Sequence, residues 1–366
     1  MAKDAAGDGP ARPRPGRNRR GAGGPLYGAI DLGTNNCRML VAKRTHRGFR
    51  VVDAYSRIVR LGEGMGASGR LSDAAMDRAL AALTACANRL ERRKVAHVRA
   101  IATEACRAAS NADVFLDRVR AETGLELEPI TPEEEARLAV QGSLDLLDEA
   151  MDAAIVVDIG GGSTELCWVD LAEWRARGGF QQGGRPPLRG WMTMPVGVVS
   201  LSERFPEPDE NRAEWYEHMK VYVNEQMNAP RGARRLRPLF EDGRAHMVGT
   251  SGTVTSVAGV HLELERYDRS RVDGLWMSAE EARAACARLA AKDAAGRAEE
   301  GCIGTERADL VLAGSAILES VMDAWPCERL RVGDRGLREG MLLNLMRPKR
   351  RRGRRRGRKR GGGGDA

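Results

Sequence analysis

Aromatic residues, long apolar runs and paired cysteines are all scarce in this chain. Phe, Trp and Tyr make up 4% of its 366 residues. No apolar run approaches the roughly 18 to 20 residues that a membrane-spanning helix requires. The seven cysteines include no Cys-x-x-Cys pair, and the five histidines lack metal-ligand spacing. This pattern argues against a membrane span, a disulfide framework and a zinc site, and it predicts a cytoplasmic protein with reduced thiols.

Positive charge is abundant, but it lies mainly at the two ends of the chain. The formal net charge is +8, yet residues 1–24 carry six Lys or Arg against two Asp, and residues 347–366 carry eleven against one. The segment between them is mildly acidic. Because Arg- and Gly-rich tracts contain too few apolar residues to form a core, residues 1–26 and 347–366 are predicted to be disordered tails. Their charge suits nonspecific contact with RNA or another polyanion.

Predicted strands and helices alternate along two halves of the chain. Short apolar runs bounded by glycine predict the strands, and apolar residues at helical spacing predict the helices. This alternation favours an α/β protein with two sheets. We expect domain I over residues 27–145, completed by a C-terminal helix within 333–346, and domain II over residues 146–332. Residues 174–190, rich in Gly, Pro and Arg, are expected to form a surface loop.

Two segments repeat one design: residues 27–41 (YGAIDLGTNNCRMLV) and residues 155–169 (IVVDIGGGSTELCWV). In each, an apolar strand ends in Asp-x-Gly and small polar residues lead into a second strand. Glycine lets the backbone approach an anion, and successive N–H groups in such a turn can form an anion-binding nest. A tight turn alone needs one glycine, whereas the second segment has three. We therefore predict phosphate binding at Gly33, Thr34, Asn35, Gly160, Gly161, Gly162, Ser163 and Thr164.

The aspartates of these segments, Asp31 and Asp158, can hold a metal ion or a water beside the phosphate. Two such loops predict a duplicated domain that holds phosphate between its halves. A third candidate lies at residues 249–253 (GTSGT), between a predicted strand and a predicted helix. A helix N-terminus offers free N–H groups to an anion, so we predict contacts from Ser251, Gly252 and Thr253. The alternative is an ordinary Ser/Thr cap without a ligand.

Three consecutive glutamates follow a strong helix start. Thr131 is a predicted N-cap, and Pro132 occupies the first helical position. Glu134 falls where a capping box turns the side chain back to the N-cap N–H, and Glu133 faces the positive end of the helix dipole. Glu135 has neither role, which makes it the candidate general base.

Arg107 follows a predicted buried strand at residues 97–103. Its guanidinium can clamp a phosphate oxygen through two N–H groups, or it can form a surface salt bridge. The residues alone leave both interpretations open.

Six stretches together resemble the exopolyphosphatase/guanosine pentaphosphate phosphatase family, whose fold belongs to the actin, sugar-kinase and Hsp70 ATPase superfamily. They occur in the family's order and span about residues 27–346. The matching stretches are AIDLGTNNCRMLVA (29–42), ATEACRAASN (102–111), ITPEEEARLAVQG (130–142), VVDIGGGSTEL (156–166), VGTSGTVTSVAG (248–259) and VGDRGLREGML (332–342).

The resemblance implies two ribonuclease-H-like domains with a cleft between them, and a divalent metal, Mg²⁺ or Mn²⁺. It also implies that Glu135, which precedes Ala-Arg as in the family's motif, is the catalytic base. Asn36 departs from the family, because many members carry Ser there. By the same resemblance, the metal ligands are Asp31, Asp158 and Glu165, and the clamp arginines are Arg38 and Arg107.

The expected reaction is release of the terminal phosphate from inorganic polyphosphate. A 5′-phosphohydrolase acting on guanosine pentaphosphate is the main alternative, because both substrates end in the same anhydride. A polyanion- or RNA-binding regulator that works through the tails is a further alternative. The chain resembles the short, two-domain form of the family, because it lacks the His-Asp pair of the longer members. A homodimer is compatible with this form.

Overall fold

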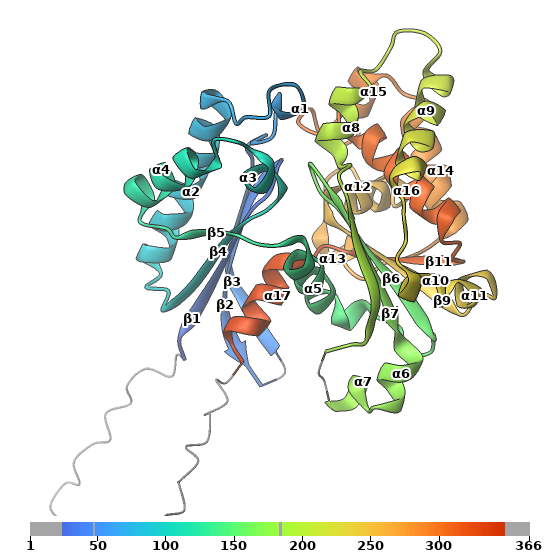
Figure 1. Cartoon of the computed structure of the whole chain (residues 1–366), viewed down its shortest axis with the longest axis horizontal. Coiled ribbons are helices and arrows are strands. Elements are labelled where there is room, and N and C mark those ends of the chain that lie inside the picture. Colours follow the sequence, from blue (N-terminus) through green and yellow to red (C-terminus); the bar gives the residue numbers. More distant parts are fainter. Residues whose placement is uncertain (1–23, 47, 183–184, 348–366) are drawn as a thin grey trace, which may run out of the picture.

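The computed structural model describes residues 24–46, 48–182 and 185–347. Two α/β halves lie side by side, each built on one sheet (Figure 1). The predicted α/β class with two sheets is therefore confirmed. Most of each predicted basic tail lies outside the described residues. No described helix has the length and apolar character that a membrane crossing requires.

The first sheet has the strand order β3-β2-β1-β4-β5. β1 is antiparallel to β2 and parallel to β4, so the sheet is mixed. Its strands are β1 (Leu26–Leu32), β2 (Asn36–Thr45), β3 (Gly48–Ile58), β4 (His97–Ala102) and β5 (Leu127–Pro129). Its helices are α1 (Met65–Ser68), α2 (Asp73–Arg92), α3 (Glu104–Ala108), α4 (Ala112–Thr123) and α5 (Pro132–Gly142), followed by a 3-10 turn at Leu144–Leu146.

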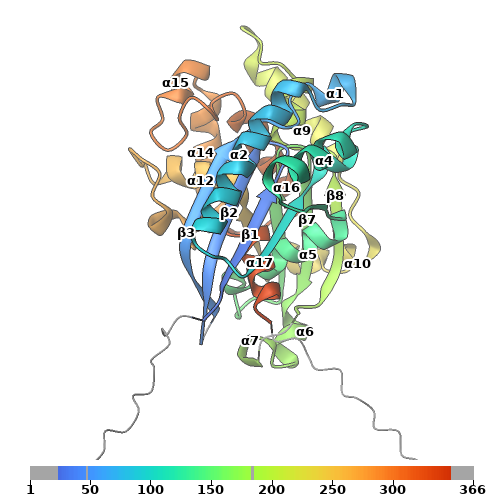
Figure 2. The ribbon, with the colours of Figure 1, turned by 90° about the vertical axis from the view of Figure 1, so that its left-hand side faces the viewer.

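Both faces of this sheet are buried. Successive residues of a strand point to opposite faces, and β1 follows this rule. Ile30 and Leu32 pack in the core that β1 shares with α2 and α4. Ala29, whose side chain points to the opposite face, packs instead with Leu138 of α5 and Met341 of the C-terminal helix α17 (Leu337–Leu345). Figure 2 views the sheet from the side covered by α2 and α4. The two helical layers hold the strand ends in fixed positions.

The second sheet repeats the first. Its order is β10-β11-β9-β6-β7-β8, in which β8-β7-β6-β9-β11 has the same pairing directions as β3-β2-β1-β4-β5. β10 adds an antiparallel edge strand. The strands are β6 (Ala153–Ile159), β7 (Thr164–Asp170), β8 (Leu188–Met194), β9 (Ala245–Thr250), β10 (Trp276–Ser278) and β11 (Arg329–Gly333).

Helices cover both faces of the second sheet as well. The central ones, α12 and α16, are apolar around most of their circumference because they lie inside this half. The helices are α6 (Leu171–Ala176), α7 (Gly179–Gln182), α8 (Val198–Arg204), α9 (Arg212–Gln226), α10 (Arg231–Arg234), α11 (Arg237–Glu241), α12 (Ser251–His261), α13 (Arg269–Val272), α14 (Ala279–Ala290), α15 (Ala294–Ala298) and α16 (Val311–Ala324).

The last helix, α17, follows β11 but packs against the first half. Leu337 and Met341 join the core formed by β1, β2 and α5. The backbones of α5 and α17 approach closely where Gly142 meets the start of α17. A Cβ on Gly142 would lie 1.9 Å from the carbonyl oxygen of Gly336, so no larger residue fits there without movement. The domain boundaries given above stay a prediction.

The expected surface loop at residues 174–190 is wrong in part. The segment contains the end of α6, the whole of α7 and the start of β8. Asp170 caps α6 by accepting a hydrogen bond from Glu173 N at 2.8 Å. The rings of Trp174 and Phe180 pack with centroids 4.3 Å apart. These apolar and capping residues stabilise short helices in a segment whose glycines and prolines predicted a loop.

Candidate functional site

The ends of the parallel strands meet in the space between the two halves. The carboxyl ends of parallel strands lie at the same edge of a sheet, and each half turns that edge toward the other. A cleft lined by residues of both halves lies there. The residues that directly follow β1, β4, β6, β9 and β11 all line it: Gly33, Thr103, Gly160, Ser251 and Asp334.

The two glycine loops touch at the centre of this cleft. A Cβ on Gly161 would lie 2.9 Å from Asn35 N and 3.0 Å from the Cβ of Thr34, so glycine is required for the contact. The loops, whose aspartates Asp31 and Asp158 are 127 positions apart in sequence, are thus brought together by the repeated fold. The predicted residues that line the cleft are Asp31, Gly33, Thr34, Asn35, Arg38, Glu135, Asp158, Gly160, Gly161, Gly162, Ser163, Glu165, Ser251, Gly252 and Thr253.

Two predicted residues do not line the cleft. Thr164 is fully buried, and its hydroxyl donates to Val196 O at 2.7 Å, so it holds the second glycine loop in place. Arg107 lies behind the cleft wall. Its guanidinium donates to Glu135 at 2.6 Å and to Glu104 at 2.8 Å. Arg107 therefore forms an ion pair, as one of its two interpretations expected, but this pair is half-buried rather than on the surface.

The glycine loops offer polar groups that have no partner within the described residues. The side-chain oxygens Thr34 Oγ1, Asn35 Oδ1 and Asn36 Oδ1 are buried without a hydrogen bond. The backbone N–H groups of Gly161 and Gly162 donate no hydrogen bond there either. Buried polar groups are almost always satisfied in folded proteins. Such a concentration at one place indicates a ligand that completes their hydrogen bonds.

The N-terminus of α12 forms a second anion-binding surface. A Cβ on Gly252 would lie 3.8 Å from Arg38 Nη2 and 3.9 Å from Arg307 Nη1, so both guanidinium groups converge there. Ser251 has a φ of 80°, which residues other than glycine rarely adopt. Its hydroxyl donates to Ile159 O at 2.7 Å and ties this turn to the end of β6. Two cations and a helix N-terminus thus face one point.

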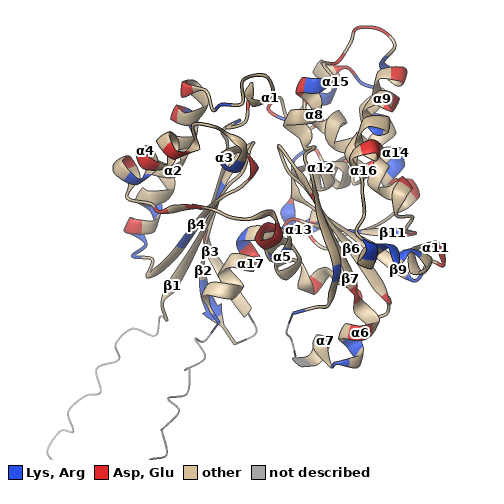
Figure 3. Ribbon diagram, viewed as in Figure 1, with Lys and Arg blue, Asp and Glu red and all other residues tan. Residues whose placement is uncertain are grey.

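α5 begins as predicted, although one contact differs. Thr131 is the N-cap and accepts a hydrogen bond from Glu134 N at 3.2 Å. The expected capping box is wrong, because the Glu134 carboxylate accepts from Arg99 Nη2 at 2.8 Å instead of turning back. The guanidinium of Arg99 offers a charged partner that a backbone N–H cannot match. Figure 3 shows the acidic first turn of α5 between the two sheets.

Glu135 is the buried member of this acidic turn. It is 6% exposed and lines the cleft, whereas Glu133 and Glu134 lie on the outside of the helix. Burial raises the pKa of Glu135 to about 7, and the Arg107 guanidinium opposes this rise. A carboxylate with a pKa near neutrality can accept a proton and release it again.

Three further carboxylates line the cleft. Burial raises the pKa of Asp31 to about 6, with Arg38 opposing the rise. Burial also raises the pKa values of Asp158 and Glu165. Repulsion from the Glu135 and Asp158 carboxylates raises the pKa of Glu165 further. The described residues contain no group of three or more Asp, Glu, His or Cys side chains gathered closely enough to hold a metal ion. Glu165 accepts from the Ser163 hydroxyl at 2.8 Å.

Several cleft residues received no role in the sequence analysis. Arg335 and Arg338 belong to the stretch VGDRGLREGML, which was matched to the family without a function for either arginine. Arg307 lies in an unmatched loop before α16, so no motif indicated it. The residues missed are Asn36, Thr103, Ser256, Arg307, Asp334, Arg335 and Arg338.

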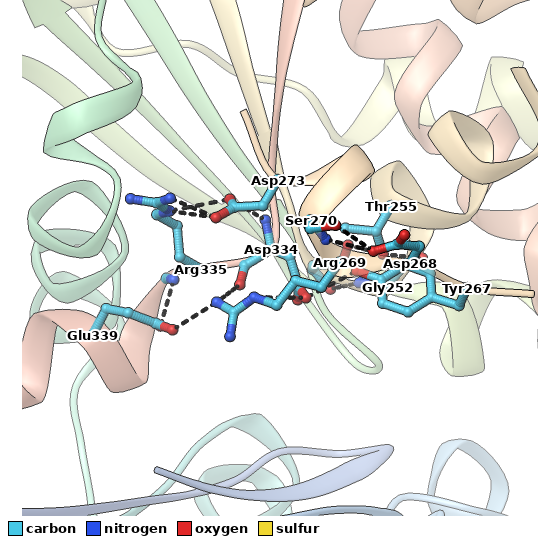
Figure 4. Close-up of polar contacts among 12 residues, drawn as sticks. Gly252, Thr255, Tyr267, Asp268, Arg269, Ser270, Asp273, Asp334, Arg335 and Glu339 are labelled. Carbon is cyan, nitrogen blue, oxygen red and sulfur yellow. Dashed lines mark hydrogen bonds and ion pairs between the residues drawn. The ribbon is translucent and has the colours of Figure 1, made fainter. Parts of the chain in front are cut away.

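A polar network fixes the turn between β11 and α17 (Figure 4). Tyr267 donates to Asp334 at 2.9 Å, and Arg269 pairs with the same carboxylate at 3.2 Å. Arg335 donates to Asp273 through its Nε at 3.1 Å. Glu339 accepts from Gly336 N at 2.9 Å. Each charge of this network has a partner of opposite sign.

The remaining arginines of the cleft are different. Among the described residues, no hydrogen bond or ion pair engages the guanidinium of Arg38, Arg307 or Arg338. Burial lowers the pKa of Arg338, and Glu339 opposes this change. Cations kept in a cleft without partners are available to an anionic ligand.

Residues 40–349 match the Ppx/GppA phosphatase family. A guanosine-5′-triphosphate,3′-diphosphate pyrophosphatase of Photobacterium profundum is 30% identical over 329 residues, covering 88% of this chain and 59% of that protein. The chain therefore spans less than two thirds of that relative's length.

Solved structures agree with this match. The structure of the Aquifex aeolicus PPX-GPPA enzyme is 27% identical in sequence and superposes with a TM-score of 0.69. The match covers 87% of this chain and 99% of that one. An exopolyphosphatase from Cytophaga hutchinsonii is 24% identical and superposes with a TM-score of 0.74. The match covers 87% of this chain and 98% of that one, and it supports the fold alone. The predicted two-domain fold of the actin, sugar-kinase and Hsp70 ATPase superfamily is confirmed. The chain belongs to the Ppx/GppA phosphatase family.

Proposed function

We propose that the cleft hydrolyses the terminal phosphoanhydride bond of inorganic polyphosphate and releases orthophosphate. One observation carries this proposal: a buried glutamate with a raised pKa, Glu135, faces the junction of two glycine loops, and three unpaired arginines line the same cleft. Loops and arginines suit a phosphate group, and the glutamate suits activation of water.

Binding of the terminal phosphate uses groups from both halves. The free N–H groups of Gly161 and Gly162 and the N-terminus of α12 face its oxygens. Arg38 and Arg307, which converge at Gly252, add positive charge from one side. Because the backbone N–H donors are fixed by the fold before substrate arrives, they stabilise developing charge without reorganising.

The chemical step is an attack of water on the terminal phosphorus. Glu135 orients the water and accepts its proton while the new P–O bond forms. The bond from phosphorus to the bridging oxygen breaks, and that oxygen leaves on a polyphosphate shortened by one unit. Arg107 holds the Glu135 carboxylate through the 2.6 Å contact and keeps part of it ionised at neutral pH. Catalysis of this kind depends mainly on positioning and electrostatics.

Members of this family generally depend on a metal. The donors in the cleft fit Mg²⁺ or Mn²⁺, because the buried oxygens of Asn35 and Asn36 lack partners and the Asp158 carboxylate raises the pKa of Asp31. Mg²⁺ needs only one or two protein carboxylates when water and substrate oxygens complete its shell. We infer that Asp31 and Asp158 would hold it. Bound there, the ion would neutralise charge on the phosphate oxygens. Glu165 as a further ligand stays a prediction.

Guanosine pentaphosphate is the second candidate substrate. The pyrophosphatase of Photobacterium profundum, 30% identical to this chain, is named for it. The terminal anhydride is the same, so the cleft described above accepts either. Location in the cytoplasm and assembly as a homodimer stay predictions.

The test is phosphate release by the purified full chain from polyphosphate and, in parallel, from guanosine pentaphosphate. Each is measured with Mg²⁺, with Mn²⁺ and after exhaustive chelation by EDTA. We expect release from polyphosphate that stops with EDTA and returns with either metal. Release from neither substrate under any of these conditions, with RNA bound through the tails, would instead favour the polyanion-binding regulator. Full activity after chelation would contradict the metal requirement alone.

A further inference from the structure

Arg307 reaches the cleft without a partner of its own. Its guanidinium forms no hydrogen bond or ion pair with any described residue, although a Cβ on Gly252 would lie 3.9 Å from its Nη1. A long side chain without partners has many rotamers, and immobilising it on a ligand costs free energy. The place of this guanidinium in the cleft therefore depends on how firmly the chain holds the backbone that carries it.

Arg60, from the first half, holds the residues on both sides of Arg307. Its Nη2 donates to the Glu306 carbonyl oxygen at 3.2 Å. The same guanidinium is bidentate on the Asp309 carboxylate, with N–O distances of 2.9 and 3.2 Å. A bidentate pair fixes the direction of approach as well as the distance. Arg60 therefore sets where the segment 306–309 lies relative to the first half.

The backbone of Arg60 is bound to the first glycine loop. The N–H groups of Val59 and Arg60 both donate to Asn35 O, at 2.8 and 3.0 Å. Gly62 N donates to Thr34 O at 3.0 Å. Arg60 has a φ of 45°, a left-handed conformation that is uncommon for residues with a side chain and that persists where the surrounding structure holds it. One residue thus joins this loop to a segment of the opposite half.

We propose that Arg60 is a positioning residue that fixes Arg307 relative to the first glycine loop, so that one terminal phosphate contacts both. The inference rests on the proposed function and deepens it by naming a residue outside the cleft on which the site depends. Because Arg60 does not line the cleft, it acts only through its partners. The alternative is a bridge that merely stabilises the contact between the halves. The Arg60 and Asp309 side chains are 33% and 49% exposed, and such pairs contribute little to stability.

The test is a double-mutant cycle of Arg60→Gln and Arg307→Gln in the full chain, with phosphate release from tripolyphosphate as the assay. Arg60→Gln alone should lower kcat/KM roughly ten- to hundredfold, because small displacements of a positioned group are costly in catalysis. In the Arg307→Gln background it should change kcat/KM by less than about twofold, because the group that it positions is already absent. Arg60→Lys keeps a charge opposite Asp309 and should recover part of the loss.

Arg283→Gln is the matched control. Arg283, on α14, pairs with Asp323 at 2.7 Å, and the two side chains are about as exposed as those of Arg60 and Asp309. Neither Arg283 nor Asp323 lines the cleft. The control should leave kcat/KM unchanged. The urea midpoint should stay near the wild-type value in Arg60→Gln and in Arg283→Gln alike, because neither pair is buried.

The outcomes separate the two proposals. A normal kcat/KM in Arg60→Gln, or equal losses in the wild-type and Arg307→Gln backgrounds, would overturn the positioning role while leaving hydrolysis in place. If the wild-type chain releases no phosphate from any substrate, the proposed function fails, and the same cycle is measured as the Kd for tripolyphosphate by calorimetry. Binding that weakens in Arg60→Gln, but not further when Arg307 is already replaced, supports positioning. Equal weakening in both backgrounds, or no binding by the wild-type chain, overturns it.

Discussion

Glu135 illustrates how far residue chemistry alone can lead. The capping argument set Glu134 aside because its side chain was expected to return to the N-cap. In the structure Glu134 is indeed occupied, but by Arg99 of β4. Glu135 is the glutamate of the three that lines the cleft, and its role as the base stays a prediction whose argument from capping was half right. Sequence near α5 cannot indicate a partner that lies 35 positions earlier in the chain.

Substitution of Glu135 is the direct test of the base. Glu135→Gln keeps the shape of the side chain and its contact with Arg107, so folding should persist while kcat falls by about 10²- to 10⁴-fold. Glu134→Gln weakens only the partly exposed pair with Arg99. It should leave kcat near the wild-type value and lower the free energy of unfolding by less than about 1 kcal/mol. Loss of activity in Glu134→Gln with normal activity in Glu135→Gln would show that the wrong residue was assigned.

The pH dependence of kcat tests the role of Arg107. Glu135 acts as a base only when ionised, and its pKa is raised to about 7, so kcat should rise with pH through this range. Arg107 opposes the rise in pKa. Arg107→Met should therefore raise the pKa of Glu135 further and move this limb upward by roughly one unit or more. Arg99→Met, which removes the partner of Glu134, is the control and should leave the limb in place. A limb that stays at the same pH in Arg107→Met contradicts the assignment.

Arg307 and Arg338 are two cleft residues that reasoning from the sequence did not identify as phosphate ligands. Neither has a neighbour in sequence that marks it as a phosphate ligand, and an isolated arginine is usually a solvated or ion-paired residue. Their shared feature is the lack of a partner in a protein whose arginines are mostly paired. That feature exists only once the chain is folded. The motif containing Arg338 could have indicated it, whereas no sequence signal indicated Arg307.

At the scale of elements, the strands and helices that could be predicted were those that short sequence patterns determine. The strand–glycine loop–strand pattern gave the β1–β2 and β6–β7 hairpins, and the GTSGT segment gave the strand end and helix start between β9 and α12. The short helices α6 and α7 were missed because glycine and proline outweighed a single capping aspartate and two aromatic rings. The crossing of α17 onto the first sheet depends on contacts that local patterns do not encode.

The crossing of α5 and α17 makes a prediction of its own. Gly142 lets the two backbones meet, and a Cβ there would lie 1.9 Å from the Gly336 carbonyl oxygen. Gly142→Ala should therefore lower the free energy of unfolding by roughly 1 to 3 kcal/mol, as overpacking does. Because Glu135 and Arg338 lie on the same two helices, kcat should fall as well. Urea unfolding and kcat measure the two effects.

Gly66→Ala is the matched control for this substitution. Gly66 lies in α1, and its nearest neighbour to an added Cβ is the flexible end of Glu203 at 3.5 Å. Its effect should stay within about 0.5 kcal/mol, as for most surface changes. Equal and small effects of both substitutions would show that the α5–α17 crossing tolerates expansion.

At the scale of the whole molecule, the site is assembled by contacts between distant parts of the chain. On the side of the glycine loops, Arg60 pairs with Asp309 at 2.9 Å and Gly64 N donates to Glu203 at 2.9 Å. Both contacts are exposed, and exposed ion pairs contribute little to stability. Apolar packing between the halves lies around α5, whose Ala136 and Val140 pack with residues of β6 and β7. The helix that carries the candidate base Glu135 is thus a helix through which the two halves make apolar contact.

The charge distribution of the whole chain gives the last prediction. Residues 348–366 lie outside the described structure, but they carry ten Lys or Arg. They follow α17, whose first turn reaches the cleft and whose nine residues span roughly 14 Å. A polyanion attracted to this segment is therefore kept near the cleft. Deleting 348–366 should raise KM for long polyphosphate, leave kcat little changed and flatten the salt dependence, with no effect on guanosine pentaphosphate. Replacing the segment with an uncharged one of equal length is the control and should reproduce the deletion. An unchanged KM for long chains at low salt would assign the segment to contacts separate from catalysis, such as RNA.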